Sequence, residues 1–377
     1  MAKIIKLFFN FFKTTIIIVF LSFILLLIID YFFGNYILKK LEPYISKTEF
    51  YERLIRIDHH VYHHTLKENI VYHKARGFDG YYTICTDSNG FKSKCNSGDR
   101  GKKFDYVFIG DSFTEGAAVK YEDSFAGMFE KESGSSLVNM GVTSYAPYIY
   151  LSKLNYFLNK GFEFKHAVIF IDISDLYDDS VFYKIDDNFN VSEKYFVEKN
   201  LKRRKFLRTN FPFTNFYMFV LKRINFNFNE KYLKEKQDKK LNFHDGKGNL
   251  KASWTYAKSD YIDGFDGSIT DSQDNLIKTT QKIYELLNKH KIKMSIVVYP
   301  WPHQLQHDTV NSKHVLMWKN FCENKCFKFI NMFAVLFKEM QESSFMNVYK
   351  KYYWWGDSHF NKEGNKLVTS ELIKNLR

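Results

Sequence analysis

Five short apolar runs, each followed by a stretch with helical spacing, limit what this chain can fold into more than any other feature. Two of them, FDYVFIG at 104–110 and HAVIFIDIS at 166–174, are apolar at nearly every position. Such runs are typical of strands covered on both faces, as in parallel sheets flanked by helices. The other three are SSLVNMG at 135–141, KMSIVVYP at 293–300 and KFINMF at 328–333. The pattern predicts a three-layer α/β/α domain around a parallel sheet of about five strands.

Helical stretches separate the apolar runs. The clearest opens at Pro147, a residue type that suits the first turn of a helix, and closes at Gly161. The others are expected at 122–132, 273–290, 314–325 and from 363 to the C-terminus. In open α/β sheets, functional sites form at the carboxyl ends of the strands. The residues that follow each apolar run are therefore the first place to search for a site.

The N-terminal stretch KTTIIIVFLSFILLLIIDYFFGNY, residues 13–36, is long and apolar enough to span a membrane. Sixteen uncharged residues lie between Lys13 and Asp30, and aromatic residues extend the stretch beyond the acid. At about 1.5 Å per residue, such a helix spans a hydrocarbon core of about 30 Å. Lysines at positions 3, 6 and 13 precede or open the stretch, which is typical of a cytoplasmic N-terminus.

No small-x-small cleavage site follows the apolar stretch, because the next residues are the bulky acid and aromatics at 30–33. We therefore expect an uncleaved signal anchor at 1–37 with a single transmembrane span. The chain from about residue 38 onward is expected outside the cytoplasm, on the periplasmic side. Lysines at 39 and 40 weaken the charge asymmetry on which this orientation depends.

The rest of the chain divides into a connector and a large domain. Residues 38–100 are polar and rich in His and Tyr, and we expect them to form a connector and small N-terminal region. Residues 101–377 contain the strand and helix pattern. Within them, the stretch from 180 to 270 is rich in Lys, Asn and Phe without clear periodicity, which indicates an inserted subdomain.

The chain is basic, with a formal net charge of +13 over 377 residues. This charge is scattered, and no basic motif with a known nucleic-acid docking geometry is present, so we expect no nucleic-acid partner. The densest basic run, LKRRKFLR at 201–208, falls in the predicted insertion. A solvated or membrane-proximal basic face is the favoured interpretation of that run.

Four cysteines form two local pairs. Cys85 and Cys95 flank the turn-rich stretch TDSNGFKSK, and Cys322 and Cys326 are four residues apart. An even count in local pairs suits an oxidising compartment, and we expect a disulfide between Cys85 and Cys95. Four unrelated thiols are the alternative. Neither pair has C-x2-C spacing, which argues against a structural zinc site.

A histidine-rich run, HHVYHH, occupies residues 59–64. It places His59 and His63, and likewise His60 and His64, four residues apart, which is a helical spacing. Such pairs can bind a metal ion, but no Glu lies between them as in the HExxH motif. We therefore expect a surface or juxtamembrane cluster of histidines and no metal site.

The segment VFIGDSFTEG, residues 107–116, ends an apolar run abruptly in Gly110, Asp111 and Ser112. A phosphate-binding P-loop needs G-x4-G-K-[ST], but here the glycines are six residues apart and alanine follows the second. The G-x-S-x-G elbow is excluded because threonine stands two residues after the serine. A turn would explain the glycine alone, whereas a nucleophile at the tip of a strand would explain all three residues.

Four blocks, in order along the chain, resemble the blocks of the SGNH (GDSL-like) hydrolase family. They are GDSFTEG at 110–116, NMGVTSY at 139–145, DISD at 172–175 (normally G-x-N-D) and GDSHFNKEGNKL at 356–367. The resemblance covers residues from about 104 to 174 and from about 277 to 377. It implies a flavodoxin-like α/β/α fold, ester hydrolysis by a serine nucleophile, and neither a metal nor an organic cofactor.

The resemblance also assigns roles to residues of this chain. Ser112 is the expected nucleophile, His359 its base, and Asp357 the acid that orients the imidazole. The oxyanion hole is expected from the N–H groups of Ser112 and Gly141 and from the hydroxyl of Ser174. The chemistry itself asks for such residues, because a serine hydroxyl needs a base within hydrogen-bond reach. A carbonyl under attack also needs donors for the negative charge that it develops.

Two departures from the family pattern bear on function. Ser174 stands where the family has Asn, so a longer side-chain donor is replaced by a shorter hydroxyl. Asp357 and His359 are separated by one residue where many members have two. This tighter spacing resembles SGNH-like proteins that O-acetylate bacterial exopolysaccharides such as alginate, and it favours a glycan substrate.

These features predict a serine esterase or O-acyltransferase acting on acyl, mainly acetyl, esters of envelope or extracellular glycans. Trp301, Trp354 and Trp355 are candidates for stacking on sugar rings, and a place at the rim of the core explains them equally well. His303 follows the fourth apolar run and is a candidate substrate contact or alternative base.

The expected partners are the glycan or another acylated small molecule, the membrane, and polysaccharide assembly proteins of the envelope. A different class of function is the alternative. A catalytically inactive protein of the same fold could bind a glycan or act as a scaffold in an assembly complex, and Ser174 and the insertion are the features that favour it.

Overall fold

The computed structural model describes residues 2–41, 55–78, 80–194, 203, 206–207, 210–214, 217, 250–256, 260 and 267–377. The chain forms two compact units. One comprises Met1–Lys47 and Tyr195–Asn242, and the other comprises Thr48–Lys194 and Phe243–Arg377. The larger unit contains the sheet and its hydrophobic core. Most of the predicted insertion, including all of the basic run 201–208 except 203, 206 and 207, lies outside the described residues.

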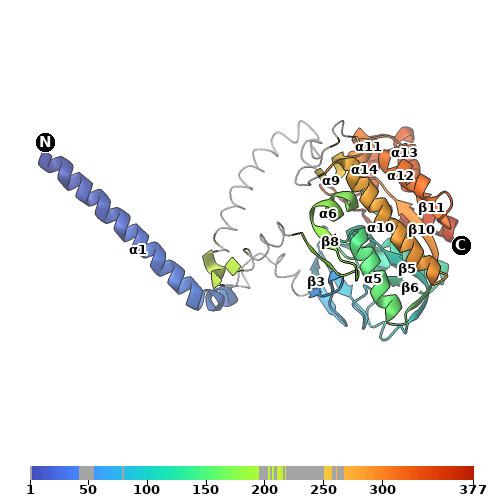
Figure 1. Cartoon of the computed structure of the whole chain (residues 1–377), viewed down its shortest axis with the longest axis horizontal. Helices are drawn as coiled ribbons and strands as arrows, with labels where there is room; N and C mark the ends of the chain where they lie inside the picture. The colour runs from blue at the N-terminus through green and yellow to red at the C-terminus, as the bar shows by residue number, and fades with distance from the viewer. Residues whose placement is uncertain are drawn as a thin grey trace. The chain divides into compact units, whose positions relative to one another are not determined.

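The smaller unit contains α1 (Ala2–Leu41), the long blue helix of Figure 1. Its stretch Phe9–Gly34 is 26 residues long and apolar enough to cross a membrane. Only 6% of its most apolar 18-residue window is buried, so protein leaves these apolar side chains uncovered and accessible to lipid. This helix agrees with the apolar stretch predicted from the sequence.

Five parallel strands form the central sheet, as the apolar runs predict. Their order is β11-β10-β7-β5-β6, and every neighbouring pair is parallel. The strands are β5 (Lys103–Ile109), β6 (Leu137–Asn139), β7 (Glu163–Ile171), β10 (Lys293–Val298) and β11 (Lys328–Asn331). All side chains from Ala167 to Ile171 in β7 are buried, which shows that this central strand is covered on both faces.

The order of the strands reverses around β5. β6 lies on one side of it, and β7, β10 and β11 lie on the other side. Crossovers between parallel strands are right-handed, so the reversal sends the connecting helices to opposite faces and opens a crevice at the carboxyl end of β5. Ser112 lies three residues beyond the last residue of that strand.

The helices expected between the strands are present. α4 (Phe125–Ser133) packs against α15 (Lys362–Leu376), and α5 (Pro147–Asn159) packs against α10 (Ile269–Lys289). Figure 1 shows α5 and α10 side by side. The other helices are α3 (Ser112–Glu115), η2 (Tyr121–Asp123), α6 (Asp175–Val181), α9 (Leu250–Ser253), α11 (Pro302–His307), α12 (Lys313–Cys322), α13 (Met332–Glu342) and α14 (Phe345–Tyr352).

Local sequence explains where these helices begin. Pro147 lies in the first turn of α5, where its missing N–H costs no hydrogen bond. Ser268 and Asp271 form a capping box at the start of α10. The side chain of Asn361 accepts hydrogen bonds from the first N–H groups of α15. Each cap satisfies backbone donors that a helix leaves without partners at its N-terminus.

Two hairpins occupy the region that the sequence presents as a polar connector. They are formed by β1 (Arg56–His59) with β2 (His63–Leu66) and by β3 (Val71–Arg76) with β4 (Tyr81–Cys85). Apolar side chains of this region, among them Ile55, Tyr62, Leu66, Ala75 and Ile84, belong to the core of the larger unit. The hairpins are therefore part of the packed domain.

The HHVYHH run lies in the β1–β2 hairpin, although the spacing of its histidines also suits a helix. His59 pairs with His63 across the β1–β2 hairpin, and His63 adopts a φ of 71°. The ring of Tyr62, in the turn of this hairpin, is buried and stacks on His59 with 3.6 Å between the ring centroids. Among the described residues, no group of three or more His, Cys, Asp or Glu side chains is placed to hold a metal ion.

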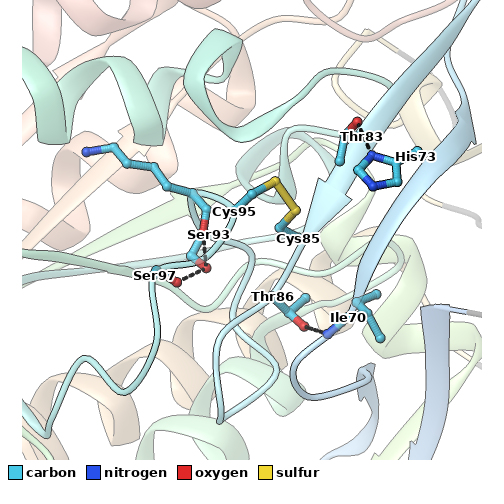
Figure 2. Close-up of a disulfide and its surroundings, with 9 residues drawn as sticks. Ile70, His73, Thr83, Cys85, Thr86, Ser93, Cys95 and Ser97 are labelled. Atoms are coloured by element: carbon cyan, nitrogen blue, oxygen red, sulfur yellow. Dashed lines mark hydrogen bonds between the residues drawn. A yellow bond between two sulfur atoms is a disulfide. The ribbon is translucent and has the colours of Figure 1, made fainter.

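Both local cysteine pairs form disulfides, which confirms the predicted Cys85–Cys95 bond and adds Cys322–Cys326. The first joins the end of β4 to the loop that follows (Figure 2). Beside it, the hydroxyl of Thr86 donates to Lys67 O at 2.6 Å and accepts from the N–H of Ile70 at 3.1 Å. The disulfide holds the second hairpin to the loop that follows it, and the bonds of Thr86 hold it to the turn that precedes it.

A third hairpin and the short helix α9 (Leu250–Ser253) lie within the predicted insertion. β8 (Tyr183–Ile185) pairs antiparallel with β9 (Val191–Glu193), and the isolated bridge between Tyr62 and Val191 joins this hairpin to the turn after β1. In α9, Lys251 contacts Asp178 of α6 at 2.5 Å. The beginning and the end of the predicted insertion thus pack against the α/β domain.

Candidate active site

The turn after β5 explains the residues with which the apolar run ends. A Cβ atom on Gly110 would lie 2.2 Å from Thr114 Oγ1 and 2.9 Å from Phe170 Cβ, so only glycine fits there. Asp111 is the N-cap of α3, where its Oδ1 accepts from the N–H of Phe113 at 2.9 Å. Ser112 is the first residue of α3, and its N–H is among the amides that a helix N-terminus leaves without an intrahelical partner.

Ser112, His359 and Asp357 form a continuous chain of hydrogen bonds. Ser112 Oγ lies 2.7 Å from His359 Nε2, and His359 Nδ1 lies 2.5 Å from Asp357 Oδ1. Ser112 and His359 are 247 positions apart along the chain. They meet because the loop between α14 and α15 lies over the carboxyl end of β5. This is the relation that a hydroxyl nucleophile, a base and an orienting acid require.

The short D-x-H spacing is compatible with this geometry. Asp357 Oδ1 accepts one hydrogen bond from the backbone N–H of His359 at 2.9 Å and another from its ring. A single oxygen therefore holds both the backbone and the imidazole of His359. The hydroxyl of Tyr349 accepts from the N–H groups of Gly356 at 2.6 Å and Asp357 at 3.2 Å. Gly356 has a φ of 79°, a conformation that favours glycine. The loop is thereby held on both sides of the acid.

The electrostatic environment favours the ion pair that the histidine would form on accepting a proton. Burial alone would lower the pKa of His359, but the hydrogen bond and charge of Asp357 reverse this effect and raise that pKa above its usual value. Burial would likewise raise the pKa of Asp357, and the interactions with His359 lower it overall. The ring of Phe113 stacks on the imidazole at 4.7 Å between centroids.

Two of the predicted oxyanion donors have partners elsewhere. The N–H of Gly141 donates to Asn139 Oδ1 at 3.0 Å. A Cβ on Gly141 would lie 2.6 Å from Thr114 Cβ, so glycine allows this loop to approach α3. The N–H of Ser174 donates to Asp172 Oδ1 at 2.6 Å, and its hydroxyl stabilises the charged forms of Asp172 and Asp178. A role for Gly141 and Ser174 in binding an oxyanion stays a prediction.

Trp301 and His303 are buried, with exposed fractions of 8% and 1%. The indole N–H of Trp301 donates to Asp172 Oδ2 at 2.7 Å. Neither residue lines the small open pocket of about 180 Å³ beside the serine. That pocket is formed by Ser112, Phe113, Gly116, Ala117, His359, Phe360 and Asn365. Contact of Trp301 or His303 with a substrate stays a prediction.

Aromatic side chains stand beside the pocket on two separate segments. Phe78, in the turn between β3 and β4, is exposed, and its ring centroid lies 5.5 Å from that of Trp354 and 6.5 Å from that of His359. Trp355 is exposed as well. The sequence indicated the two tryptophans, but it gave no sign of Phe78, because the hairpin that positions it was not predicted.

Three carboxyl groups are buried behind the serine. The Tyr299 hydroxyl donates to Asp111 Oδ1 at 3.2 Å, and the Tyr150 hydroxyl donates to Asp175 Oδ2 at 3.0 Å. Burial is the main cause that raises the pKa of Asp111, Asp172 and Asp175, and repulsion between the carboxyl groups raises it further for Asp111 and Asp175. These three carboxyl groups therefore hold their protons to a higher pH than exposed carboxyl groups do.

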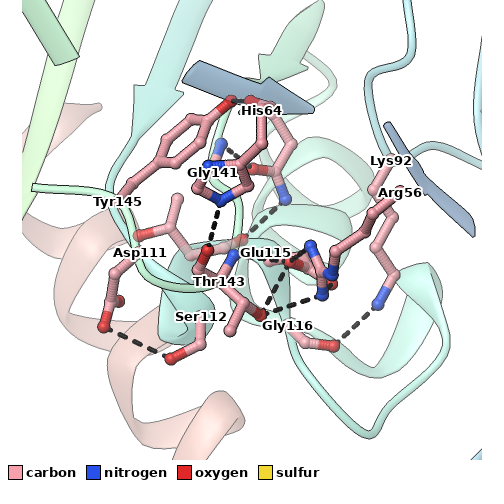
Figure 3. A network of polar contacts seen from close by, with 12 residues as sticks. Arg56, His64, Lys92, Asp111, Ser112, Glu115, Gly116, Gly141, Thr143 and Tyr145 are labelled. Carbon is pink, nitrogen blue, oxygen red and sulfur yellow. Dashed lines mark hydrogen bonds and ion pairs between the residues drawn. The ribbon is translucent and has the colours of Figure 1, made fainter. Parts of the chain in front are cut away.

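An ion pair connects the N-terminal hairpins to the serine helix (Figure 3). Arg56 Nη1 and Nη2 donate to the two carboxylate oxygens of Glu115, at 2.8 and 2.9 Å. Glu115 Oε2 also accepts from the N–H of Thr143 at 2.7 Å and from its hydroxyl at 2.9 Å. His64 Nε2 donates to Thr143 O at 2.9 Å. Glu115 thus links α3, which begins at Ser112, to the loop that contains Gly141.

No protein-family model and no curated protein match the sequence. Among solved structures, the chain is similar to a lipolytic protein of the G-D-S-L family from Desulfitobacterium hafniense DCB-2, with 13% identity, 73% of this chain and 99% of that chain covered, and a TM-score of 0.36. An acetyl-xylooligosaccharide esterase from Geobacillus has 11% identity, 73% and 94% coverage, and a TM-score of 0.37. The esterase EstA from Pseudoalteromonas sp. has 9% identity, 73% and 97% coverage, and a TM-score of 0.34.

Proposed function

We propose that this chain is a membrane-anchored SGNH-type serine esterase or O-acyltransferase that acts on acetyl esters of envelope glycans. The observation that carries the proposal is the hydrogen-bonded chain of Ser112, His359 and Asp357 at the carboxyl end of β5. The same three residues stand in the blocks GDSFTEG and GDSHFNKEGNKL, and this sequence pattern supports the proposal as well.

In the proposed reaction, Ser112 Oγ attacks the ester carbonyl carbon while its proton passes to His359 Nε2. The tetrahedral intermediate then collapses, the bond to the leaving alcohol breaks, and His359 gives its proton to that alcohol. Water or the hydroxyl of an acceptor sugar attacks the acyl-serine, and His359 takes the proton of the attacking group. Ser112 leaves with a proton, and the product is free acetate or an acetylated acceptor.

The surroundings of the serine support a small acyl group on a sugar. The pocket beside Ser112 is small, and Phe113 and Phe360 are among its lining residues, which supports a small apolar acyl group. Exposed Phe78 and Trp355 offer ring faces of the kind on which sugars stack. The two disulfides support an extracytoplasmic location, since such bonds persist in oxidising compartments. Envelope polysaccharide assembly proteins are the proposed partners.

The second candidate is a catalytically inactive glycan-binding protein of the same fold. The observation that favours it is the state of the predicted oxyanion donors: Gly141 N–H is bound to Asn139, and the Ser174 hydroxyl interacts with buried acids. Losing one oxyanion donor costs about 10² to 10³ in rate. If neither donor becomes available to the substrate, binding would remain without turnover.

A fluorophosphonate probe tests the two candidates directly. If the chain is an enzyme, we expect the probe to label the full-length protein and Ser112→Ala to abolish the labelling. Ser370→Ala, at an exposed position of α15, is the control and should leave the labelling unchanged. Absence of labelling on folded wild-type protein would favour the binding protein. Acetate release from an acetylated sugar, measured with and without an acceptor glycan, then separates hydrolysis from transfer.

A further inference from the structure

A carboxylate inside the apolar stretch of α1 has an unusual set of partners. Asp30 is only 3% exposed, although it belongs to the span Phe9–Gly34. Its Oδ1 accepts from the N–H of Phe213 at 2.8 Å, and its Oδ2 accepts from the N–H of Thr214 at 2.7 Å. A charged group in or near a bilayer is costly unless it is paired or hydrogen-bonded. The two backbone donors meet that requirement.

These donors belong to a part of the insertion that we call the return segment. It comprises the described residues 203, 206, 207, 210–214 and 217, which lie in the same compact unit as α1. The ring of Tyr31 lies 6.0 Å from that of Phe211. A Cβ on Gly34 would lie 2.9 Å from Pro212 Cγ, so glycine permits a close approach. The return segment therefore packs on the C-terminal end of the apolar stretch.

The return segment presents large apolar side chains to the outside. Phe206, Phe213 and Tyr217 are 59%, 40% and 55% exposed. On α1, exposed aromatic rings at positions 31–33 stand at the same end of the span. Arg203, the basic residue of the return segment, is exposed, and the sequence 201–208 around it contains five basic residues. Apolar rings combined with Lys and Arg at the end of a membrane span are typical of a segment in the interfacial layer.

We propose that the return segment lies in the headgroup layer of an anionic bilayer, where its apolar side chains insert beside α1 and its exposed Arg203 binds lipid phosphate. Asp30 fixes the segment at this depth through the two backbone hydrogen bonds. A lipid surface fits better than a protein partner because the exposed rings continue the apolar surface of the span itself. The proposal rests on α1 crossing a membrane and is independent of the catalytic assignment.

The test uses the full-length chain reconstituted into vesicles that contain phosphatidylglycerol. Single cysteines are introduced as Phe206→Cys or Tyr217→Cys and labelled with bimane without reductant, so that the native disulfides stay closed. Ser370→Cys on α15 is the matched control in the larger unit. Quenching by spin-labelled lipid reports contact with lipid, and quenching by iodide reports contact with water.

We expect the labels at 206 and 217 to be quenched by shallow spin-labelled lipid and to be protected several-fold from iodide relative to the label at 370. Asp30→Leu, which removes the acceptor but keeps an apolar side chain, should raise iodide quenching at 206 while flotation with vesicles is unchanged. Zwitterionic vesicles should weaken lipid quenching, because the phosphate layer then carries no net charge.

Three results would overturn the proposal. Iodide quenching at 206 and 217 equal to that at 370 would place the segment in water. Protection from iodide without lipid quenching would mean that protein covers it. Failure of the wild-type chain to float with vesicles would show that the chain does not bind a membrane, which is the premise of the proposal. None of these readouts depends on activity, so a silent active site would not affect the conclusion.

Discussion

Arg56 and Glu115 form a bidentate ion pair that joins the first hairpin to the helix beginning at Ser112. The Glu115 side chain is 1% exposed, and that of Arg56 is 16% exposed. Burial would raise the pKa of Glu115, but the charge and hydrogen bonds of Arg56 lower it to about 2. Residues before 100 thus stabilise the loop and helix of the site.

Removal of one partner from this pair should be strongly destabilising. We expect Arg56→Ala to lower the free energy of unfolding by about 3–5 kcal/mol, because a buried carboxylate is left without its cation. Lys103→Ala is the matched control: its pair with Glu163 is exposed, and such pairs contribute about 0–1 kcal/mol. Denaturant unfolding measures both, and equal small losses would contradict a structural role for Arg56.

The same pair predicts how stability depends on pH. Glu115 has a lower pKa in the folded state than in the unfolded state, so its contribution is present above the unfolded value of about 4.3. That contribution is lost as the pH falls from about 4.3 towards 2. In Glu115→Gln, the loss of stability across this range should therefore be smaller than in the wild-type protein.

The proposed triad predicts a non-additive pattern of activity. Ser112→Ala and His359→Ala should each lower turnover by several orders of magnitude, and the double variant should be hardly worse than either. The reason is that each substitution alone already disables the nucleophile. His303→Ala should mainly raise KM if that residue touches substrate. Near-wild-type activity of His359→Ala together with a collapse in His303→Ala would move the base to the end of β10.

Asp357 should set the pH dependence of the reaction. The pKa of His359 is raised, and the base is active only when neutral, so kcat/KM should rise with pH through a value above the usual 6.5. Asp357→Asn removes the anion that raises this pKa and should move the acidic limb to lower pH. It should also lower kcat by about 10⁴ through loss of the favoured tautomer, while the protein stays folded. An unshifted limb would contradict the assignment.

The parts of this fold that the sequence predicts are those with strong periodicity. Continuous apolar runs such as β7 are buried on both faces, so their pattern needs no information from elsewhere in the chain. The three residues of the proposed triad could be named from the sequence for a related reason, since each stands in a short recognisable block that follows a strand or precedes a helix. Loop 353–361 then needs only to reach the end of β5.

The hairpins before residue 100 were missed because their strands are short and carry exposed polar side chains. β3, with the sequence VYHKAR, alternates poorly, and its register shifts between Tyr72 and Ala75. What fixes these strands is distant: Tyr62 packs on Phe157, and Arg56 reaches Glu115. Contacts of this kind leave no local signal, so Phe78 and the Arg56–Glu115 pair could not be assigned from the sequence.

Deletion of residues 1–36 should yield a folded, soluble domain, because the only membrane-length helix among the described residues is α1 and the larger unit has its own core.

The truncated chain still contains the return segment. It should therefore bind anionic vesicles weakly at low salt and be released at high salt, since a single interfacial segment gives marginal and reversible binding. Replacing 201–217 with a Gly/Ser linker of equal length should abolish even the low-salt binding, while hydrolysis of p-nitrophenyl acetate is unchanged in both truncated forms. Truncated protein that stays in the membrane fraction after a high-salt wash would show that α1 is not the single anchor.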